Sequence, residues 1–302
     1  MGLRRTLGWA IGGWAAWRLL GPEVAPAFRG VQERPSPLVG RTVEVGAHEF
    51  FVREAGSADA PPLVLVHGWV YDGYATWHRV IPRLAEHRRV VAIDLRNHGK
   101  SDRRRGRFEI EDLADEVAGV LRALGMGRVP VVGYSMGGMT AQALARRHPA
   151  VVERLVLAAT AAKPVPWPRW LVVPVFLAGR TLARIDRITV PRIMHRYLLA
   201  TGAVGAEHSA WLWQALMDRD PDLYYEAGFA ITRFDSTEWI GRIDVPALVI
   251  VPGRDQLIPP GAQRETARML PNASLVEIPG ARHEAVLTHA DRVAAEILGF
   301  LE

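Results

Sequence analysis

Short apolar runs alternate with amphipathic stretches along most of the chain. The runs "PLVLV", "RVVAIDL", "VPVVG", "RLVLAAT" and "ALVIV" are continuously apolar, which is typical of buried strands in a parallel sheet. They are separated by stretches that predict helices, near 76–86, over 110–125 and over 262–270, and a last helix ends in "AAEILGFL". A hairpin is expected at 41–56. This alternation predicts an α/β fold, with a mostly parallel central sheet flanked by helices on both faces.

Residues 161–240 interrupt this alternation. They contain several prolines, five tryptophans and no clear buried strand, and their pattern predicts helices near 170–183, 187–201 and 206–217. An insertion of this length between two strands is predicted to form a helical cap over the sheet. The core would then comprise residues 41–160 and 241–302. The stretch "PVPWPRWLVVPVFLAG" is very apolar for a lid that faces solvent, so it either meets a hydrophobic substrate or packs on the sheet.

The first 30 residues form a separate apolar segment. It begins with basic Arg4 and Arg5, continues as an apolar run over 7–20 that Arg18 interrupts, and contains three tryptophans. Fourteen residues of helix reach only about 21 Å, short of a hydrocarbon core of about 30 Å. The composition favours a retained segment lying at a membrane surface through residues 1–20, with a cleaved export signal as the alternative. Residues 31–40 are predicted to be a linker.

Charge and composition exclude some classes of partner. The net charge of +5 comes from 37 basic and 32 acidic residues, and the arginines are dispersed along the chain. Because there is no basic stripe with interleaved aromatic residues, we expect no nucleic-acid partner. The absence of cysteine rules out disulfides and thiol catalysis.

Three polar residues follow the carboxyl ends of predicted strands, where ligands bind in sheets of this kind. Ser135 follows "VPVVGY", Asp255 follows "ALVIVPGR" and His283 follows "SLVEIPGAR". Ser135 also lies within a G-x-S-x-G pattern at 133–137, between a strand and a helix-forming stretch. That context predicts a nucleophile elbow, although a glycine-rich turn with a solvated serine has the same local pattern.

The chain resembles the α/β-hydrolase superfamily over roughly residues 41–302, and it looks closest to serine esterases and lipases with a helical cap. The motifs that carry the resemblance are "HGW" at 67–69, "DLRNHGKSD" at 94–102, "GYSMGG" at 133–138, "GRDQLIP" at 253–259 and "GARHEAVLTH" at 280–289. Asn97 stands where many relatives have glycine. Relatives that are epoxide hydrolases or haloalkane dehalogenases have aspartate at the elbow, so Ser135 argues against both activities.

The chemistry of the three residues assigns their roles. A neutral serine hydroxyl needs a base within hydrogen-bond reach, and the base needs a third group to orient it. We therefore expect Ser135 to be the nucleophile, His283 the general base and acid, and Asp255 the carboxylate that fixes the histidine tautomer. The backbone N–H groups of Met136 and Trp69 are expected to form the oxyanion hole.

Other polar residues at the strand ends have simpler explanations. His67 and His98 are expected to brace their loops, and His289 to lie on the surface or pack within the last helix. The histidines do not form an H-E-x-x-H pattern, so we expect no metal site, and we expect no cofactor.

The expected reaction is hydrolysis of a small-molecule carboxylic ester, with a hydrophobic, lipid-like acyl group. The alternatives that use the same residues are acyl transfer to another acceptor and perhydrolysis of the cofactor-free haloperoxidase type. A catalytically silent binding module on the same fold is the remaining hypothesis.

Overall fold

A computed structural model describes residues 38–302 of the chain. The segment predicted to meet a membrane and nearly all of the predicted linker lie outside the described residues. Within them, one sheet has the strand order β1-β2-β4-β3-β5-β6-β7-β8. The strands are β1 (Gly40–Val45), β2 (His48–Ala55), β3 (Pro62–Val66), β4 (Arg89–Ile93), β5 (Val129–Tyr134), β6 (Val152–Ala158), β7 (Ala247–Pro252) and β8 (Ala273–Ile278).

The sheet is mostly parallel. β1 and β2 form the predicted antiparallel hairpin, and β2 pairs antiparallel with β4. Every other neighbouring pair is parallel, so β3 to β8 end at the same edge. All residues of β5 and β7 are buried, which explains why their sequences are continuously apolar.

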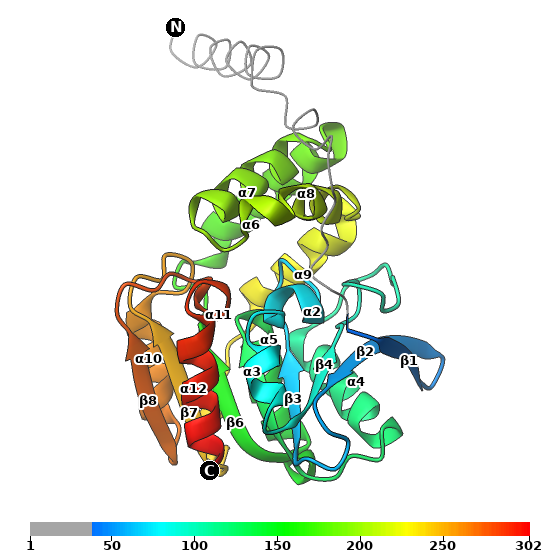
Figure 1. Cartoon of the computed structure of the whole chain (residues 1–302). Coiled ribbons are helices and arrows are strands. Elements are labelled where there is room, and N and C mark those ends of the chain that lie inside the picture. The colour runs from blue at the N-terminus through cyan, green and yellow to red at the C-terminus, as the bar shows by residue number, and fades with distance from the viewer. Residues whose placement is uncertain (1–37) are drawn as a thin grey trace, which may run out of the picture.

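Helices cover both faces of the sheet, as the alternation predicts (Figure 1). The helices on one face are α4 (Ile110–Ala123), α5 (Met136–Arg147) and α10 (Pro260–Met269), and those on the other are α2 (Gly73–Trp77), α3 (Ile81–Ala85), α11 (Ala285–Thr288) and α12 (Ala290–Leu301). Each set encloses its own apolar cluster against the strands.

The helix predicted near 76–86 is wrong in its bounds, because the chain forms the two short helices α2 and α3 there. The side chain of Asp72 accepts a hydrogen bond of 2.7 Å from the backbone N–H of Ala75, so it caps α2 and starts the helix earlier than predicted. Pro82 lies in the first turn of α3, where its missing N–H costs nothing. The apolar periodicity alone did not reveal this break.

Four helices lie between β6 and β7 in the sequence and above the carboxyl ends of the parallel strands (Figure 1). They are α6 (Arg169–Ile185), α7 (Thr189–Ala200), α8 (Ser209–Met217) and α9 (Pro221–Arg233). The first three match the predicted helices, and α9 was not predicted. Asp220 caps α9 by accepting the N–H of Asp222 at 2.8 Å. Across residues 38–302, no helix combines the length and the apolarity that crossing a membrane requires.

Candidate active site

Ser135 occupies the sharp turn between β5 and α5. Its backbone has φ +53° and ψ −118°, a conformation that a residue with a side chain rarely adopts. The turn is held from both sides: the Ser135 N–H donates to the carbonyl of Ala158 at 2.9 Å, and its own carbonyl accepts the N–H of Gly138 at 2.9 Å. The strained serine therefore stands at the start of a helix, with its hydroxyl directed out of the sheet edge.

Two glycines make this turn possible. A Cβ on Gly133 would come within 2.3 Å of the Gly137 carbonyl oxygen, and a Cβ on Gly137 would come within 2.2 Å of the Val66 carbonyl oxygen. Both distances are far below van der Waals contact, so neither position can carry a side chain without moving the backbone. The first turn of α5 thus packs directly on the end of β3.

The structure brings Ser135, His283 and Asp255 together from three separate strand ends. The Ser135 hydroxyl lies 3.0 Å from Nε2 of His283, and Nδ1 of His283 lies 2.8 Å from Oδ2 of Asp255. All three side chains are buried, with Ser135 only 8% exposed. A proton on Nδ1 would be donated to Asp255, which leaves Nε2 free to accept the serine proton.

Asp255 is held by further hydrogen bonds. Its Oδ1 accepts the backbone N–H groups of Leu257 and Ile258, each at 2.9 Å, and its Oδ2 accepts Nε2 of Gln263 at 2.9 Å. Sequence reasoning missed Gln263, which is fully buried in α10. The loop between β7 and α10 places the Gln263 side chain against the Asp255 carboxylate, and no sequence motif indicates this contact.

The two expected oxyanion-hole donors lie beside Ser135. Within residues 38–302, neither the Met136 N–H nor the Trp69 N–H donates to a protein acceptor. Met136 is the first residue of α5, and a Cβ on Gly68 would lie 3.3 Å from the Cβ of Ser135, so the loop that carries Trp69 passes directly over the serine. Both donors are therefore available for a negative oxygen on a substrate.

His67 and His98 hold the loop that carries Trp69. Nε2 of His67 accepts the N–H of Leu95 at 2.9 Å, so its Nδ1 carries the proton and donates to the Gly68 carbonyl at 2.6 Å. The ring of His98 lies 2.9 Å from the Trp69 carbonyl through Nε2. Burial lowers the pKa of His67 to about 4 and that of His98 to about 3, so both rings are neutral near pH 7. Bracing, as expected from the sequence, explains both residues.

Trp69 also connects the core to the helices above it. Its indole N–H donates to the carbonyl of Tyr224 at 2.7 Å, and its ring stacks on the rings of Tyr224 and Phe176 at centroid distances of 4.5 and 5.7 Å. Gly228 in α9 leaves room for this stack, because a Cβ there would come within 2.5 Å of Phe176 and 2.7 Å of Trp69. No local sequence pattern indicates this contact.

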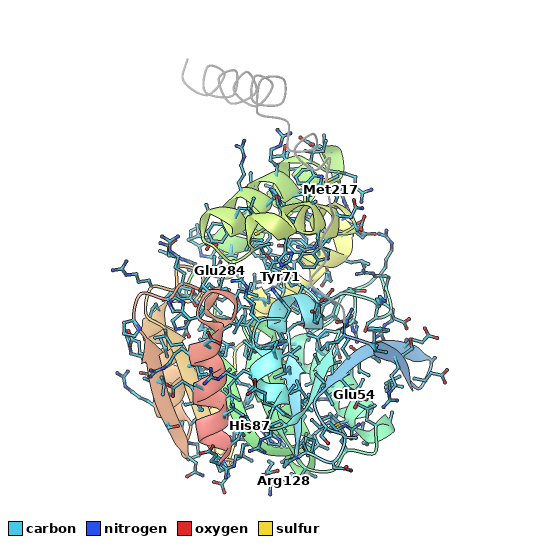
Figure 2. The ribbon with its side chains drawn as sticks, in the orientation of Figure 1. Glu54, Tyr71, His87, Arg128, Met217 and Glu284 are labelled. Carbon is cyan, nitrogen blue, oxygen red and sulfur yellow. The ribbon has the colours of Figure 1, made fainter. Side chains whose placement is uncertain are left out.

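A buried polar group lies next to the histidine. Glu284 follows His283, is buried, and has one carboxylate oxygen, Oε2, without a hydrogen-bond partner. Burial and a hydrogen bond with Glu284 raise the pKa of Tyr197, in α7, to about 12. Figure 2 shows Glu284 and Tyr71 at the top of the core, directly below the inserted helices.

The part of the chain that the structure describes contains no group of three or more histidine, aspartate or glutamate side chains able to hold a metal ion. The groups that meet at this site are the serine hydroxyl, the imidazole, the carboxylate and two backbone donors.

Comparison with known proteins identifies the family of this site. The model of the α/β hydrolase fold matches residues 61–290. The chain is 32% identical to a pimeloyl-[acyl-carrier protein] methyl ester esterase from Chromobacterium violaceum, over 83% of this chain and 98% of that protein. It is 30% identical to a non-heme chloroperoxidase from Streptomyces lividans, over 83% of this chain and 95% of that protein.

Solved structures give the same result. The enol-lactonase from Burkholderia xenovorans LB400 superposes with a TM-score of 0.75 at 29% identity, over 86% of this chain and 99% of that one. A thermophilic esterase from Thermogutta terrifontis has a TM-score of 0.73 at 26% identity, over 87% and 98% of the two chains. From the fold, the family match and these relatives together, the chain belongs to the α/β-hydrolase family.

Proposed function

We propose that this α/β hydrolase cleaves carboxylic esters, with Ser135 as nucleophile, His283 as general base and acid, and Asp255 as the orienting carboxylate. The observation that carries the proposal is the continuous hydrogen-bonded series from the serine hydroxyl through the imidazole to the carboxylate, at 3.0 and 2.8 Å. The esterases and the enol-lactonase among its relatives act on the same type of bond, as their names state.

In the first half of the reaction, Oγ of Ser135 attacks the ester carbonyl while its proton passes to Nε2 of His283. The carbonyl oxygen becomes an oxyanion that the N–H groups of Trp69 and Met136 stabilise. The intermediate collapses, the bond to the alkoxy oxygen breaks, and the imidazolium gives its proton to the departing alcohol. Asp255 stabilises the imidazolium throughout and is not itself protonated.

In the second half, water replaces the alcohol. The water oxygen attacks the acyl carbon while His283 takes a proton from the water. His283 then gives that proton to Oγ of Ser135 when the acyl–enzyme bond breaks. The products are the free acid and the original enzyme. Because the three side chains are buried, bulk water does not compete with the hydrogen bonds that orient them.

Helix α6 supports a hydrophobic, lipid-like substrate. Its packed side presents Val173, Phe176 and Ala183 to an aromatic cluster with α9, yet its other side is apolar too. The exposed residues include Trp170 at 73%, Val175 at 68% and Ile185 at 77%. Large apolar side chains exposed together on one helix are unusual in a soluble protein, and such patches mark surfaces that meet a membrane or another apolar partner.

Charge favours an anionic lipid surface as the partner of this exposed face. Between residues 169 and 200 the sequence has six arginines and a single aspartate, and that aspartate, Asp186, is buried. Arg169 at the start of α6 is exposed, and so is Arg184 near its end, which also donates to Asp222 at 2.7 Å. Apolar side chains that enter the interface, flanked by arginines that meet anionic headgroups, are the combination that holds amphipathic helices on such membranes. The enzyme would then take its ester from the bilayer.

The decisive test of the ester hydrolase proposal is Ser135→Ala. The substitution removes the nucleophile, and we expect kcat for a soluble 4-nitrophenyl ester to fall by about 10⁴ or more. A fluorophosphonate probe should label the wild-type protein at Ser135 and leave the variant unlabelled. Labelling of the variant, or turnover close to wild type, would place the nucleophile elsewhere.

A second candidate function uses the same residues with another acceptor. Two relatives are named as non-heme chloroperoxidase and non-heme haloperoxidase, which favours hydrogen peroxide among the alternative acceptors. Attack of peroxide on the acyl-enzyme would release a peracid and restore Ser135. Product analysis with water, peroxide and an alcohol in competition decides between hydrolysis, perhydrolysis and acyl transfer, because each acceptor leaves a different acyl product.

A further inference from the structure

A large cavity lies between the inserted helices and the core, beside the loop that carries Trp69, and its lining does not include Ser135, Asp255 or His283. Its volume is about 650 Å³, within the range of small-molecule sites. Its walls come from the loop before α2, the loop after β4, the first residues of β1, and the segment from α8 to α9. Chain segments that are distant in the sequence therefore meet around one space.

Three hydrogen-bond donors on the wall of this cavity have no acceptor. The hydroxyl of Tyr71 and Nδ2 of Asn97 are buried without a partner, and both residues are only 7% exposed. The third is the guanidinium of Arg219, which lies over the Tyr224 ring at 5.2 Å. No carboxylate in residues 38–302 forms an ion pair with it. Arg219 itself is half-buried. Buried donors without acceptors, such as those of Tyr71 and Asn97, are costly, so in native proteins they are nearly always paired with protein, an ordered water or a ligand.

Each carboxylate on the wall of the cavity accepts at least one hydrogen bond from the protein. Asp72 caps α2, Asp218 accepts Nε2 of Gln214 at 2.8 Å, and Asp220 caps α9 and pairs with Arg105 at 2.7 Å. Further cations line the same walls: Arg53, which pairs with the buried Asp94 at 2.9 Å, and Lys100 and Arg103. The buried side-chain donors of this wall that lack an acceptor are those of Tyr71 and Asn97, and Arg219 adds a cation without an ion pair to the described residues.

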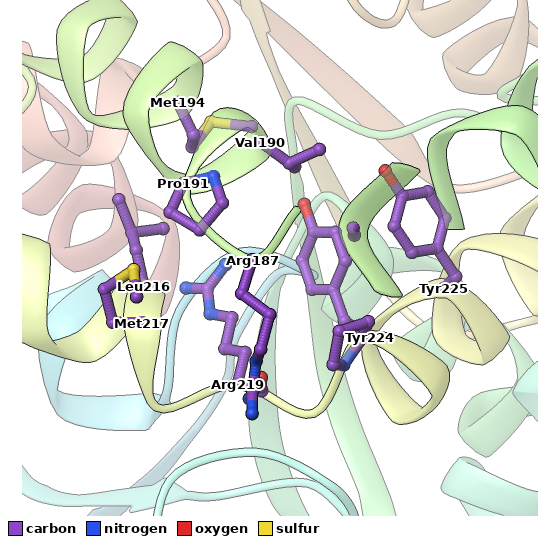
Figure 3. Close-up of a pocket in the computed structure, with 11 residues that line it drawn as sticks. Arg187, Val190, Pro191, Met194, Leu216, Met217, Arg219, Tyr224 and Tyr225 are labelled. Atoms are coloured by element: carbon purple, nitrogen blue, oxygen red, sulfur yellow. Dashed lines mark hydrogen bonds between the residues drawn. The ribbon is translucent and has the colours of Figure 1, made fainter. Parts of the chain in front are cut away.

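Arg219 stands at the boundary between this cavity and a second, small apolar pocket within the inserted helices. The second pocket has a volume of about 40 Å³ and is lined mainly by aliphatic and aromatic side chains (Figure 3). Burial lowers the pKa of the Arg219 guanidinium below its usual range, although it stays charged at pH 7. A cation next to an apolar pocket, with no ion-paired carboxylate among residues 38–302, can be stabilised by a ligand that supplies an anion.

Tyr71 relates the cavity to the reacting groups. Tyr71 and Arg219 line the same cavity, and Tyr71 and Glu284 both lie at the top of the core, below the inserted helices (Figure 2). Burial raises the pKa of the Tyr71 hydroxyl, Arg219 lowers it and Glu284 raises it. Because Glu284 is the neighbour of His283 in the sequence, the wall of the cavity lies in the same region of the molecule as the segment that carries the proposed base.

We propose that this cavity binds an anionic oxygen group, a carboxylate or a phosphate, carried by the ester at a distance from its scissile bond, with Arg219, Tyr71 and Asn97 as its donors. This inference rests on the proposed ester hydrolase function for its biological meaning, and it makes the preferred substrate amphipathic. An acyl or alkyl part would enter from the apolar side while the anion is held by the arginine.

A matched pair of esters tests the preference. Mono-4-nitrophenyl adipate carries a terminal carboxylate, and 4-nitrophenyl hexanoate has the same chain length without it. We expect the wild-type enzyme to have the higher kcat/KM for the adipate ester. Arg219→Met should lower the ratio of kcat/KM for the adipate ester to kcat/KM for the hexanoate ester by about 10- to 100-fold, because the variant loses a charge-assisted hydrogen bond. Arg122→Met, at an exposed arginine of α4, should keep the wild-type ratio. An unchanged ratio in Arg219→Met overturns the proposal.

A binding measurement separates this inference from the proposed function. Calorimetry on the Ser135→Ala protein would use adipate and, separately, glycerol 3-phosphate as probes, which shows whether carboxylate or phosphate is preferred. We expect binding of at least one probe, weakened about tenfold or more by adding Arg219→Met, and weakened less by adding Tyr71→Phe. Tyr71→Phe removes only a hydroxyl without a partner, so the fold should tolerate it. Binding of neither probe, or equal binding with and without Arg219, overturns the inference even if the protein hydrolyses neutral esters.

Discussion

At the scale of single residues, the proposed triad depends on side chains that never meet the substrate. Gln263 donates both to Oδ2 of Asp255 at 2.9 Å and to the Ile258 carbonyl at 2.8 Å, so it fixes the carboxylate relative to the loop after β7. It is a positioning residue, because it acts on the reaction only through Asp255.

We expect Gln263→Leu to lower kcat about tenfold or more with a much smaller change in KM, because the carboxylate loses the donor that aligns it with His283. The comparison is Gln142→Leu, which removes another fully buried glutamine, one that accepts the Ser236 hydroxyl at 2.7 Å. Both variants should be less stable, but only Gln263→Leu should lose turnover per folded molecule. Equal effects on kcat would reduce Gln263 to a packing residue.

His67 makes stability depend on pH. Its folded pKa of about 4 lies below the ordinary value of 6.5, so between these values the unfolded chain binds a proton that the folded chain does not. Stability is therefore complete above about pH 6.5 and falls as the pH drops toward 4, by about 2 kcal/mol at pH 5 from this residue.

The measurement is urea unfolding at pH 7.5 and pH 5 for the wild-type protein and for His67→Gln. Glutamine can keep one donor and one acceptor but does not titrate, so the free energy of unfolding should lose about 1–2 kcal/mol less between the two pH values in the variant. His98 contributes in the same direction and remains in both proteins. Identical pH dependence in the two proteins would show that His67 is not the titrating group.

At the scale of elements, sequence patterns predicted most of the strands and helices that depend on local periodicity, but not the break between α2 and α3. The continuously apolar strands, the hairpin and α4 lie where the sequence predicts them. Ser135, Asp255 and His283 are in contact because the parallel strands that precede them end at the same edge of the sheet. The miss at α9 has a physical cause. Gly228 weakens its helical pattern, and the reason for that glycine is a tertiary contact with Phe176 and Trp69 that no local pattern contains.

Gly228→Ala should therefore reduce activity more than its helix propensity suggests. Alanine is the better helix former, but its Cβ would lie 2.5 Å from Phe176 and 2.7 Å from Trp69, so the aromatic stack must shift. The Trp69 N–H is a proposed oxyanion donor, and we expect kcat/KM to fall about tenfold or more.

The matched control is Gly299→Ala in α12, where a Cβ would meet nothing within 4 Å. That variant should keep full activity and gain up to about 1 kcal/mol of stability from helix propensity. Steady-state kinetics and thermal unfolding of both variants provide the comparison. Full activity in Gly228→Ala would mean that the contact between α9 and the loop after β3 does not position the oxyanion donor.

At the scale of the whole molecule, two features with different chemistry lie on the inserted helices. The exposed side of α6 is apolar, whereas the segment between α8 and α9 places Arg219 on a cavity with unpaired donors. An ester with a lipid-like chain and an anionic group would match both. Neither feature could be derived from sequence alone, because the pattern of α6 left open whether its apolar side faces the sheet or solvent.

The association with membranes gives the last prediction. Trp170 and Val175 are largely exposed on α6, and their transfer into an interface contributes at about 25 cal/mol per Å² of apolar surface. Trp170→Glu/Val175→Glu should therefore weaken binding to liposomes that contain anionic lipid by about tenfold or more, while hydrolysis of a soluble short-chain ester stays within a few-fold of wild type. Deletion of residues 1–30 should weaken liposome binding independently. The control Leu275→Glu, on edge strand β8, should bind liposomes as the wild type does. Sedimentation with the liposomes measures all four proteins, and undiminished binding of the α6 variant would restrict any membrane contact to the first 30 residues.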